Sequence, residues 1–146
     1  MSKPKVTMYT DGACRGNPGP GGWAVLLEWN EKKKEISGGE KLTTNNRMEM
    51  RAIIEGLRSL NKPCAVSIFS DSALIINTFT KGWILNWQRR NWKKANKSPV
   101  ENQDLWQEML SAMDAHTVRW VKVKGHSTDR RNNLVDELAV RESRKF

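Results

Sequence analysis

Residues 9–23 read YTDGACRGNPGPGGW, and they divide the N-terminal part of the chain into two strands. The β-prone run from Val6 to Asp11 predicts the first strand, and the glycine- and proline-dense segment after it predicts a tight turn. Residues 23–30 (WAVLLEWN) predict a second strand, and residues near 35–41 suggest a third. Strands with such short connections indicate an antiparallel meander.

After the meander, helical and strand patterns alternate. Thr43 or Thr44 can cap a helix that runs to about Leu60, and Asn132 or Asn133 can cap the last helix. Between them we expect strands at 65–70 and 117–123 and helices at 72–80 and 101–115. This order predicts an α/β fold with a mixed sheet and helices on its faces. The length of 146 residues predicts a single domain, residues 1–146.

The composition points to an anionic partner. The chain has 25 Lys and Arg against 16 Asp and Glu, a formal charge of +9, which favours nucleic acid, although plain solubility is the alternative. Two cysteines without a C-x-x-C pair argue against a disulfide framework or a structural zinc site. No apolar leader or membrane-length run stands in the sequence, so we expect a cytoplasmic, soluble monomer that binds no membrane.

Four acidic residues stand far apart, each in a distinctive context: Asp11 in YTDGA, Glu49 in TTNNRMEM, Asp71 in IFSDS and Asp136 in NNLVDELA. Asp11 and Asp71 are expected at the ends of adjacent strands, where side chains share a crevice. Glu49 lies about one and a half turns into its helix and can point back over the sheet. Asp136 is expected to open the last helix. Because like charges repel, a fold that gathers four carboxylates usually holds cations there.

Taken singly, these acids have simpler explanations. Asp71 could be a helix N-cap, and Asp136 could be a favourable charge near a helix N-terminus. Taken together, they predict a site of hard oxygen ligands, which suits Mg²⁺ or Mn²⁺. Two such ions about 4 Å apart can activate water and stabilise the leaving oxygen of a phosphodiester without a covalent nucleophile.

Polar residues near these acids have two interpretations each. His126, in a polar loop, could shuttle a proton, or it could be an ordinary exposed histidine. Asn17, Asn45 and Asn46 could donate to base edges in a minor groove or to a 2′-hydroxyl, or they could serve turns and caps.

A basic, tryptophan-rich segment follows. From Ser72 to Val100 there are six basic residues and no acidic one, and Trp83, Trp87 and Trp92 are interleaved with basic side chains that include Lys93 and Lys94. The tryptophans could be core residues under a solvated face, or the segment could contact phosphates and bases. We expect both, with tryptophans that brace a protrusion over about residues 81–100 and charges that face outward.

These motifs, with VKGHS before NNLVDELA, resemble bacterial ribonuclease H type 1 from Val6 to Arg141. The resemblance implies a ribonuclease H-like fold with a five-stranded mixed sheet and a basic substrate-binding handle. It implies an endoribonuclease that hydrolyses the RNA strand of an RNA–DNA hybrid and leaves 5′-phosphate and 3′-hydroxyl ends.

The resemblance also assigns roles to residues. Two Mg²⁺ ions, with Mn²⁺ as a possible substitute, would be held by Asp11, Glu49, Asp71 and Asp136, and His126 would assist proton transfer or product release. The minor groove of the hybrid would be contacted by Asn17, Asn45 and Asn46, and a DNA-strand phosphate by Thr44 and Asn102. Trp83 would line the DNA channel, and Lys93 and Lys94 would contact the substrate from the handle. No obligate protein partner is implied.

Three positions depart from the family pattern. Ala73 stands where glutamine is common, Leu74 where an aromatic is common, and Leu42 cannot supply a charged phosphate contact. They bear on substrate affinity rather than on the metal site. Two alternatives remain: a hybrid-binding module without catalysis, and a DNA-cleaving nuclease of the same fold.

Overall fold

The computed structural model describes residues 3–124 and 129–146. Its centre is a five-stranded sheet in the order β3-β2-β1-β4-β5. The strands are β1 (Lys5–Cys14), β2 (Gly19–Trp29), β3 (Lys32–Thr43), β4 (Ala65–Ser70) and β5 (Thr117–Lys122). The first three strands form an antiparallel meander, whereas β4 pairs in parallel with both β1 and β5. The predicted mixed α/β sheet is therefore confirmed.

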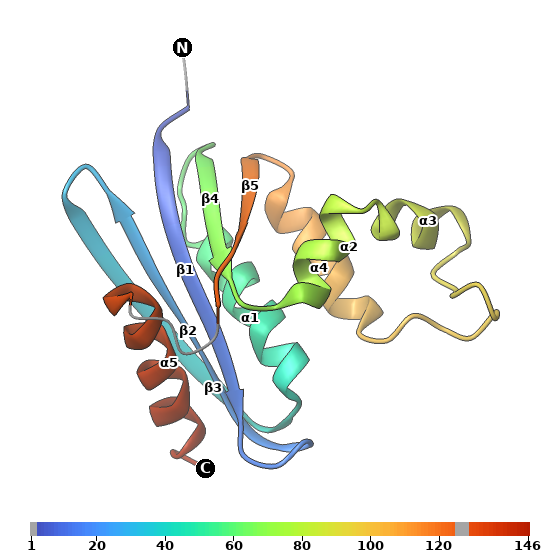
Figure 1. Ribbon diagram of the computed structural model, residues 1–146, viewed down its shortest axis with the longest axis horizontal. Helices are drawn as coiled ribbons and strands as arrows, with labels where there is room; N and C mark the ends of the chain where they lie inside the picture. Colours follow the sequence, from blue (N-terminus) through green and yellow to red (C-terminus); the bar gives the residue numbers. More distant parts are fainter. Residues whose placement is uncertain (1–2, 125–128) are drawn as a thin grey trace.

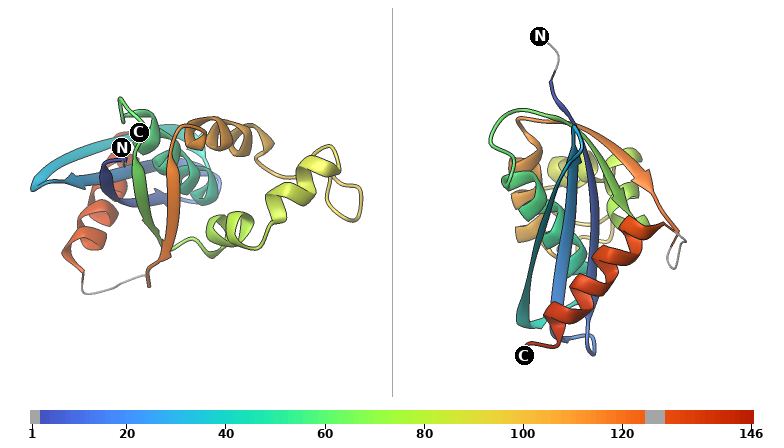
Figure 2. Two further views of the ribbon diagram at one scale, coloured as in Figure 1. Left: turned by 90° about the horizontal axis from the view of Figure 1, so that it is seen from above. Right: turned by 90° about the vertical axis from the view of Figure 1, so that its left-hand side faces the viewer.

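Helices cover both faces of the sheet (Figures 1 and 2). They are α1 (Asn45–Arg58), α2 (Ala73–Thr80), α3 (Trp83–Arg89), α4 (Gln103–Met113) and α5 (Arg130–Ser143). Helix α1 packs on β1 and β2 from one side and is flanked by α4, while α5 packs on β1, β2 and β3 from the other side. Helices α2 and α3 lead into a protrusion beside the sheet (Figure 1).

Each face of the sheet has its own hydrophobic cluster. Met8 belongs to the larger cluster under α1 and α4, and its neighbour Tyr9 belongs to the smaller cluster under α5. Successive side chains of a strand point to opposite faces, so Asp11 shares the α5 face with Tyr9. Gly12 faces α1, and a Cβ at Gly12 would overlap the backbone of Glu49. A glycine is therefore needed for α1 to approach β1 at the level of the acidic residues.

The first strand is longer than its sequence predicts. Asp11 lies inside β1, opposite Ala24, rather than at a strand end, and pairing continues to Cys14 opposite Gly21. The reason is that the glycine-rich residues at the start of β2 are extended and paired rather than part of the turn. The connection shrinks to residues 15–18, with a cis peptide bond between Asn17 and Pro18.

The predicted start of the last helix is wrong. Asp129, not Asn132 or Asn133, is the N-cap, and its Oδ1 accepts a hydrogen bond of 2.9 Å from the Arg131 backbone. Aspartate caps as well as asparagine does, and the helix runs on through both asparagines. Asp136 consequently lies in the second turn of α5 instead of opening the helix.

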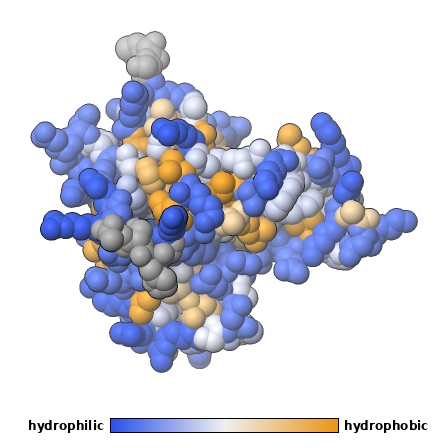
Figure 3. Space-filling model, viewed as in Figure 1, coloured by the Kyte–Doolittle hydropathy of each residue, from blue (hydrophilic) through white to orange (hydrophobic). Residues whose placement is uncertain are grey.

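Tryptophans brace the protrusion, as expected. Trp87 and Trp92 are partly buried against the larger cluster, and the ring of Trp87 lies 5.6 Å from that of Trp106 in α4. The face of the protrusion seen in Figure 3 is largely hydrophilic, although Leu85 of α3 is an exposed apolar residue. Among the described residues, no helix is long and apolar enough to span a membrane.

Candidate metal centre and nucleic-acid groove

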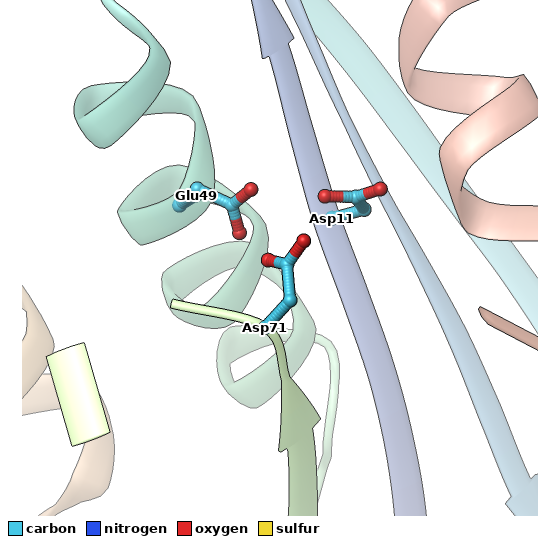
Figure 4. Close-up of side chains that lie close together, drawn as sticks. All are labelled: Asp11, Glu49 and Asp71. Carbon is cyan, nitrogen blue, oxygen red and sulfur yellow. The ribbon is translucent and has the colours of Figure 1, made fainter. Parts of the chain in front are cut away.

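Three of the four acids meet at one point. Asp11, Glu49 and Asp71 each offer a carboxylate oxygen, and these three oxygens lie within 4.8 Å of one another. Figure 4 shows the side chains converging from β1, α1 and the end of β4. Asp11 and Glu49 are buried, and Asp71 is half-buried.

Local structure places these side chains. The N-cap Thr44 starts α1 beside β1, which puts Glu49 in the second turn and on the buried side of the helix. Asp71 follows the last residue of β4, and Ser72 caps α2 immediately after it. Asp71 is thus fixed between a strand and a helix cap, but its own side chain does not serve as the cap. This answers the simpler explanation for Asp71, because the capping oxygen belongs to Ser72.

The electrostatics of the cluster are unfavourable without a cation. Burial, aided by the charges of Asp71 and Asp136, raises the pKa of Asp11 from 3.8 to about 7, although hydrogen bonds from Glu49 and the Gly12 backbone oppose the rise. Burial, followed by the charge of Asp11, raises the pKa of Glu49 well above its ordinary value. The raised pKa values mean that the ionised forms of Asp11 and Glu49 are disfavoured in the metal-free fold. A bound divalent cation would stabilise both ionised carboxylates.

One atom tests whether a cation fits. Glu49 Oε2 is buried and has no hydrogen-bond partner among the described residues. An ionised carboxylate oxygen buried without a donor is strongly disfavoured, whereas coordination to a hard cation satisfies it. The donor set consists of carboxylate oxygens only, which is the set that Mg²⁺ or Mn²⁺ prefers.

Asp136 lies on the wall of the same cavity but outside the tight cluster. The cavity has a volume of about 240 Å³, and its lining includes Asn45 and Asn133 together with all four acids. Asp136 is exposed, so its carboxylate faces the open side of the cavity. The fold therefore brings all four predicted acids to one cavity, three of them in direct convergence.

His126 falls within residues 125–128, which lie outside the described residues. Its predicted role stays a prediction. The other histidine of the chain, His116, has a structural role. His116 Nδ1 accepts a hydrogen bond of 3.0 Å from the Cys64 backbone, and burial lowers its pKa.

The asparagines near the acids are exposed at the rim of the site. Asn17 Oδ1 accepts a hydrogen bond of 3.0 Å from the Asn45 backbone, so Asn17 also braces the start of α1. Asn45 and Asn46 lie in the first turn of that helix, and both line a groove that runs past Glu49 and Asp71 to Ala73 and Leu74. Cap chemistry and groove lining coexist here, so neither of the two interpretations from sequence excludes the other.

Thr44 and Asn102 are linked by a residue that sequence reasoning missed. The Arg47 backbone donates to Thr44 Oγ1 at 3.3 Å, and its guanidinium donates to Asn102 Oδ1 at 3.2 Å. The same guanidinium forms a two-pronged pair with Asp104, at 3.0 and 2.8 Å. This hydrogen bond orients the Asn102 amide, whose NH₂ group is the only donor that the side chain can offer to a phosphate. No local sequence signal marks this arrangement, since Arg47 and Asn102 are 55 residues apart.

The predicted handle residues differ in exposure and in ion pairing. Lys93 is exposed, whereas Lys94 is half-buried and its Nζ lies 3.6 Å from Glu101 Oε1. Trp83 begins α3 and is half-buried. Lys93 is therefore the better placed of the two lysines for a phosphate contact.

Known proteins resemble this chain along nearly its whole length. Residues 3–144 match the family model described as RNase H. A protein named Ribonuclease H from Caldanaerobacter subterraneus subsp. tengcongensis is 57% identical over 140 residues, covering 96% of this chain and 92% of the relative. Another Ribonuclease H, from Moorella thermoacetica, is 55% identical over 135 residues, covering 92% and 89% of the two chains.

Solved structures share the fold. The crystal structure of LC9-RNase H1, described as a type 1 RNase H with the type 2 active-site motif, superposes with a TM-score of 0.89 at 33% identity, covering 99% of this chain and 74% of the other. The structure of LC11-RNase H1 in complex with RNA/DNA hybrid has a TM-score of 0.70 at 24% identity, covering 96% and 97%.

Proposed function

Because this chain belongs to the ribonuclease H family, we propose that it hydrolyses the RNA strand of RNA–DNA hybrids with the help of two Mg²⁺ ions, leaving 5′-phosphate and 3′-hydroxyl ends. The observation that carries the proposal is the convergence of Asp11, Glu49 and Asp71, with one Glu49 oxygen buried and without a partner among the described residues. Bound divalent ions would supply an activated water and charge stabilisation at the leaving oxygen.

The protein's own residues would have three tasks. Asp11, Glu49, Asp71 and Asp136 would hold the ions, with Asp136 completing the site from α5. His126 would accept or deliver a proton during the reaction. A groove that already contains the Asn45 and Asn46 side chains would lead the substrate past the carboxylates.

Substrate choice would depend on sugar and shape recognition. RNA supplies 2′-hydroxyls on one strand, and DNA supplies a more deformable backbone on the other, so a surface that reads both strands rejects either pure duplex. Asn17, Asn45 and Asn46 would contact the minor groove, and Thr44 and Asn102 would contact a DNA-strand phosphate. Trp83, Lys93 and Lys94 would contact the DNA strand from the protrusion. We expect weak base preference, because few of these contacts read base edges.

The test is a cleavage assay on one sequence prepared as RNA–DNA hybrid, RNA duplex, DNA duplex and single-stranded RNA. Each form is incubated with Mg²⁺, Mn²⁺ or a chelator, and the product ends are identified. We expect metal-dependent cutting of the hybrid's RNA strand alone. Binding without cutting under both metals would favour the non-catalytic module, and cleavage of the DNA duplex would favour a DNA nuclease of this fold. We further propose that the protein acts in the cytoplasm as a monomer, which fractionation and sedimentation would check.

A further inference from the structure

An aromatic pair lies directly beside two of the acids. The rings of Tyr9 in β1 and Phe69 in β4 are stacked, with centroids 4.4 Å apart and planes inclined by 13°. The two residues are partners in the parallel pairing of their strands. Each precedes an acid by two positions, Tyr9 before Asp11 and Phe69 before Asp71.

The stack stands where the two strands separate. Pairing between β1 and β4 runs from Lys5 opposite Ala65 to Tyr9 opposite Phe69 and goes no further. Strand β4 ends one residue later, while β1 continues beside β2 alone. The ring pair is therefore the last side-chain contact between paired positions on this face before the carboxylates of Asp11 and Asp71.

A force acts to open the strands at this point. Asp11 and Asp71 bring carboxylate oxygens within 4.8 Å of each other, and like charges at that distance repel. Backbone pairing no longer opposes this repulsion beyond Tyr9 and Phe69. The stack does oppose it, and so does the Thr10 hydroxyl, which donates to the Phe69 carbonyl oxygen at 3.1 Å.

The stack is also tied to α5, the helix that carries Asp136. The Tyr9 hydroxyl donates to Asp129 Oδ2 at 3.5 Å, at the N-cap of that helix. The Arg131 guanidinium carbon lies 5.9 Å from the Tyr9 ring centroid, and Arg131 also pairs with Glu28 of β2. One cluster thus joins β1 and α5, which carry Asp11 and Asp136, to β4, which ends just before Asp71.

We propose that the Tyr9–Phe69 stack is a positioning device that holds Asp11 and Asp71 at their binding separation before a cation arrives. The Tyr9 hydroxyl donates to Asp129 and the Phe69 side chain has no polar atom, so we assign Tyr9 and Phe69 a positioning role rather than a catalytic one. Their effect would be on metal affinity, because a site that is already assembled loses less free energy to reorganisation on binding. This inference rests on the proposed metal-dependent function and names what assembles its site.

The test compares variants that lose the ring with variants that keep it. Phe69→Leu and Tyr9→Leu remove the stack but keep an apolar side chain, whereas Phe69→Tyr and Tyr9→Phe retain two rings. Phe79→Leu is a matched control, because Phe79 stacks on Trp120 at 5.1 Å and 14° with no acid of the cluster next to either ring in sequence. Mn²⁺ binding to each metal-free protein is measured by calorimetry, with unfolding followed separately to establish that each variant is folded.

We expect the ring-losing variants to bind Mn²⁺ roughly two- to tenfold more weakly, the range of one aromatic pair interaction. The Mg²⁺ concentration for half-maximal cleavage should rise in parallel, while the KM for hybrid changes less than twofold. The ring-keeping variants should bind Mn²⁺ within twofold of wild type, and so should Phe79→Leu even if it loses stability.

Unchanged Mn²⁺ affinity in the ring-losing variants would overturn the proposal, and so would an equal loss in Phe79→Leu. If both ring-losing variants fail to fold, the ring-keeping pair decides: a large loss of affinity in them would show that ring stacking is not what holds the site. The wild-type protein separates this proposal from the broader one. Wild type that binds Mn²⁺ but cuts no hybrid would refute the proposed reaction and leave the positioning role open to the same measurement.

Discussion

Replacing Asp11 by asparagine should stabilise the metal-free protein while it abolishes cleavage. The Gly12 backbone donates to Asp11 Oδ1 at 2.8 Å, and an asparagine Oδ1 can accept the same hydrogen bond. The substitution therefore removes a charge and keeps the local geometry. Loss of cleavage follows because an amide is a poor substitute for a carboxylate ligand of Mg²⁺.

The size of the stabilisation follows from the pKa of Asp11. Burial raises this pKa from 3.8 to about 7 in the metal-free fold. Since one pKa unit corresponds to 1.36 kcal/mol, ionised Asp11 costs the fold about 4 kcal/mol at pH 8. Between pH 4 and 7 the folded protein holds a proton that the unfolded chain has released. The contribution of Asp11 to the free energy of unfolding must then fall as the pH rises through this window and level off above it, and the raised pKa of Glu49 adds a decline of the same sign.

Guanidinium unfolding of metal-stripped protein from pH 4 to 8 measures the effect, with wild type and Asp11→Asn compared at each pH. We expect the variant to be more stable than wild type at pH 8 by up to about 4 kcal/mol and to lack the part of the decline that Asp11 contributes, while the part due to buried Glu49 remains. Added Mg²⁺ should stabilise wild type and narrow the difference. An identical pH profile in the two proteins, or a variant that still cuts hybrid at the wild-type rate, would refute the reasoning.

Three further predictions concern residues around the site. In Arg47→Lys the side chain cannot keep both the two-pronged pair with Asp104 and the hydrogen bond to Asn102. The KM for hybrid should therefore rise roughly threefold to tenfold while kcat stays within twofold of wild type. Steady-state kinetics measures both, and a fall in kcat at unchanged KM would contradict this prediction. Lys93→Ala should weaken binding and lower the slope of log Kd against log salt by about one, and Lys94→Ala by less because of its ion pair; equal slopes in all three proteins would exclude a phosphate contact. Burial lowers the pKa of His116, so its contribution to stability is complete above about pH 6.5 and is lost as the pH falls. The free energy of unfolding should therefore drop less between pH 7.5 and pH 5 in His116→Asn than in wild type.

The sequence predicted the architecture because each element carries its own local signal. Alternating apolar residues, a threonine before α1 and a serine before α2 mark where chain segments begin, and the structure uses both caps. The predicted start of α5 was wrong because Asp129, shortly before the predicted Asn132 and Asn133, caps the helix instead. Local propensity does not choose among residues that cap equally well.

The acids could be found in the sequence, but their energetics could not. The sequence pattern placed Asp11 and Asp71 at the ends of adjacent strands, with Glu49 pointing back over the sheet. It could not show that Glu49 is buried or that one of its oxygens has no partner among the described residues. Burial depends on how closely α1 approaches β1, and that distance is set by the absence of a side chain at Gly12. Because Gly12 acts through the absence of a side chain, no local sequence pattern marks its role.

The same limit applies to the residues that we propose to position the acids and to the residue that links Thr44 with Asn102. Tyr9, Phe69 and Arg47 act through partners that are 55 or more residues away in the chain, so no local pattern distinguishes them from ordinary strand and helix positions. Tyr9 and Phe69 contact each other two positions before the acids, whereas Arg47 contacts the predicted site residues Thr44 and Asn102 directly. A cluster of like charges can persist in a fold only if the surrounding contacts resist its tendency to separate. The residues that make those contacts are the ones that a list of ligands leaves out.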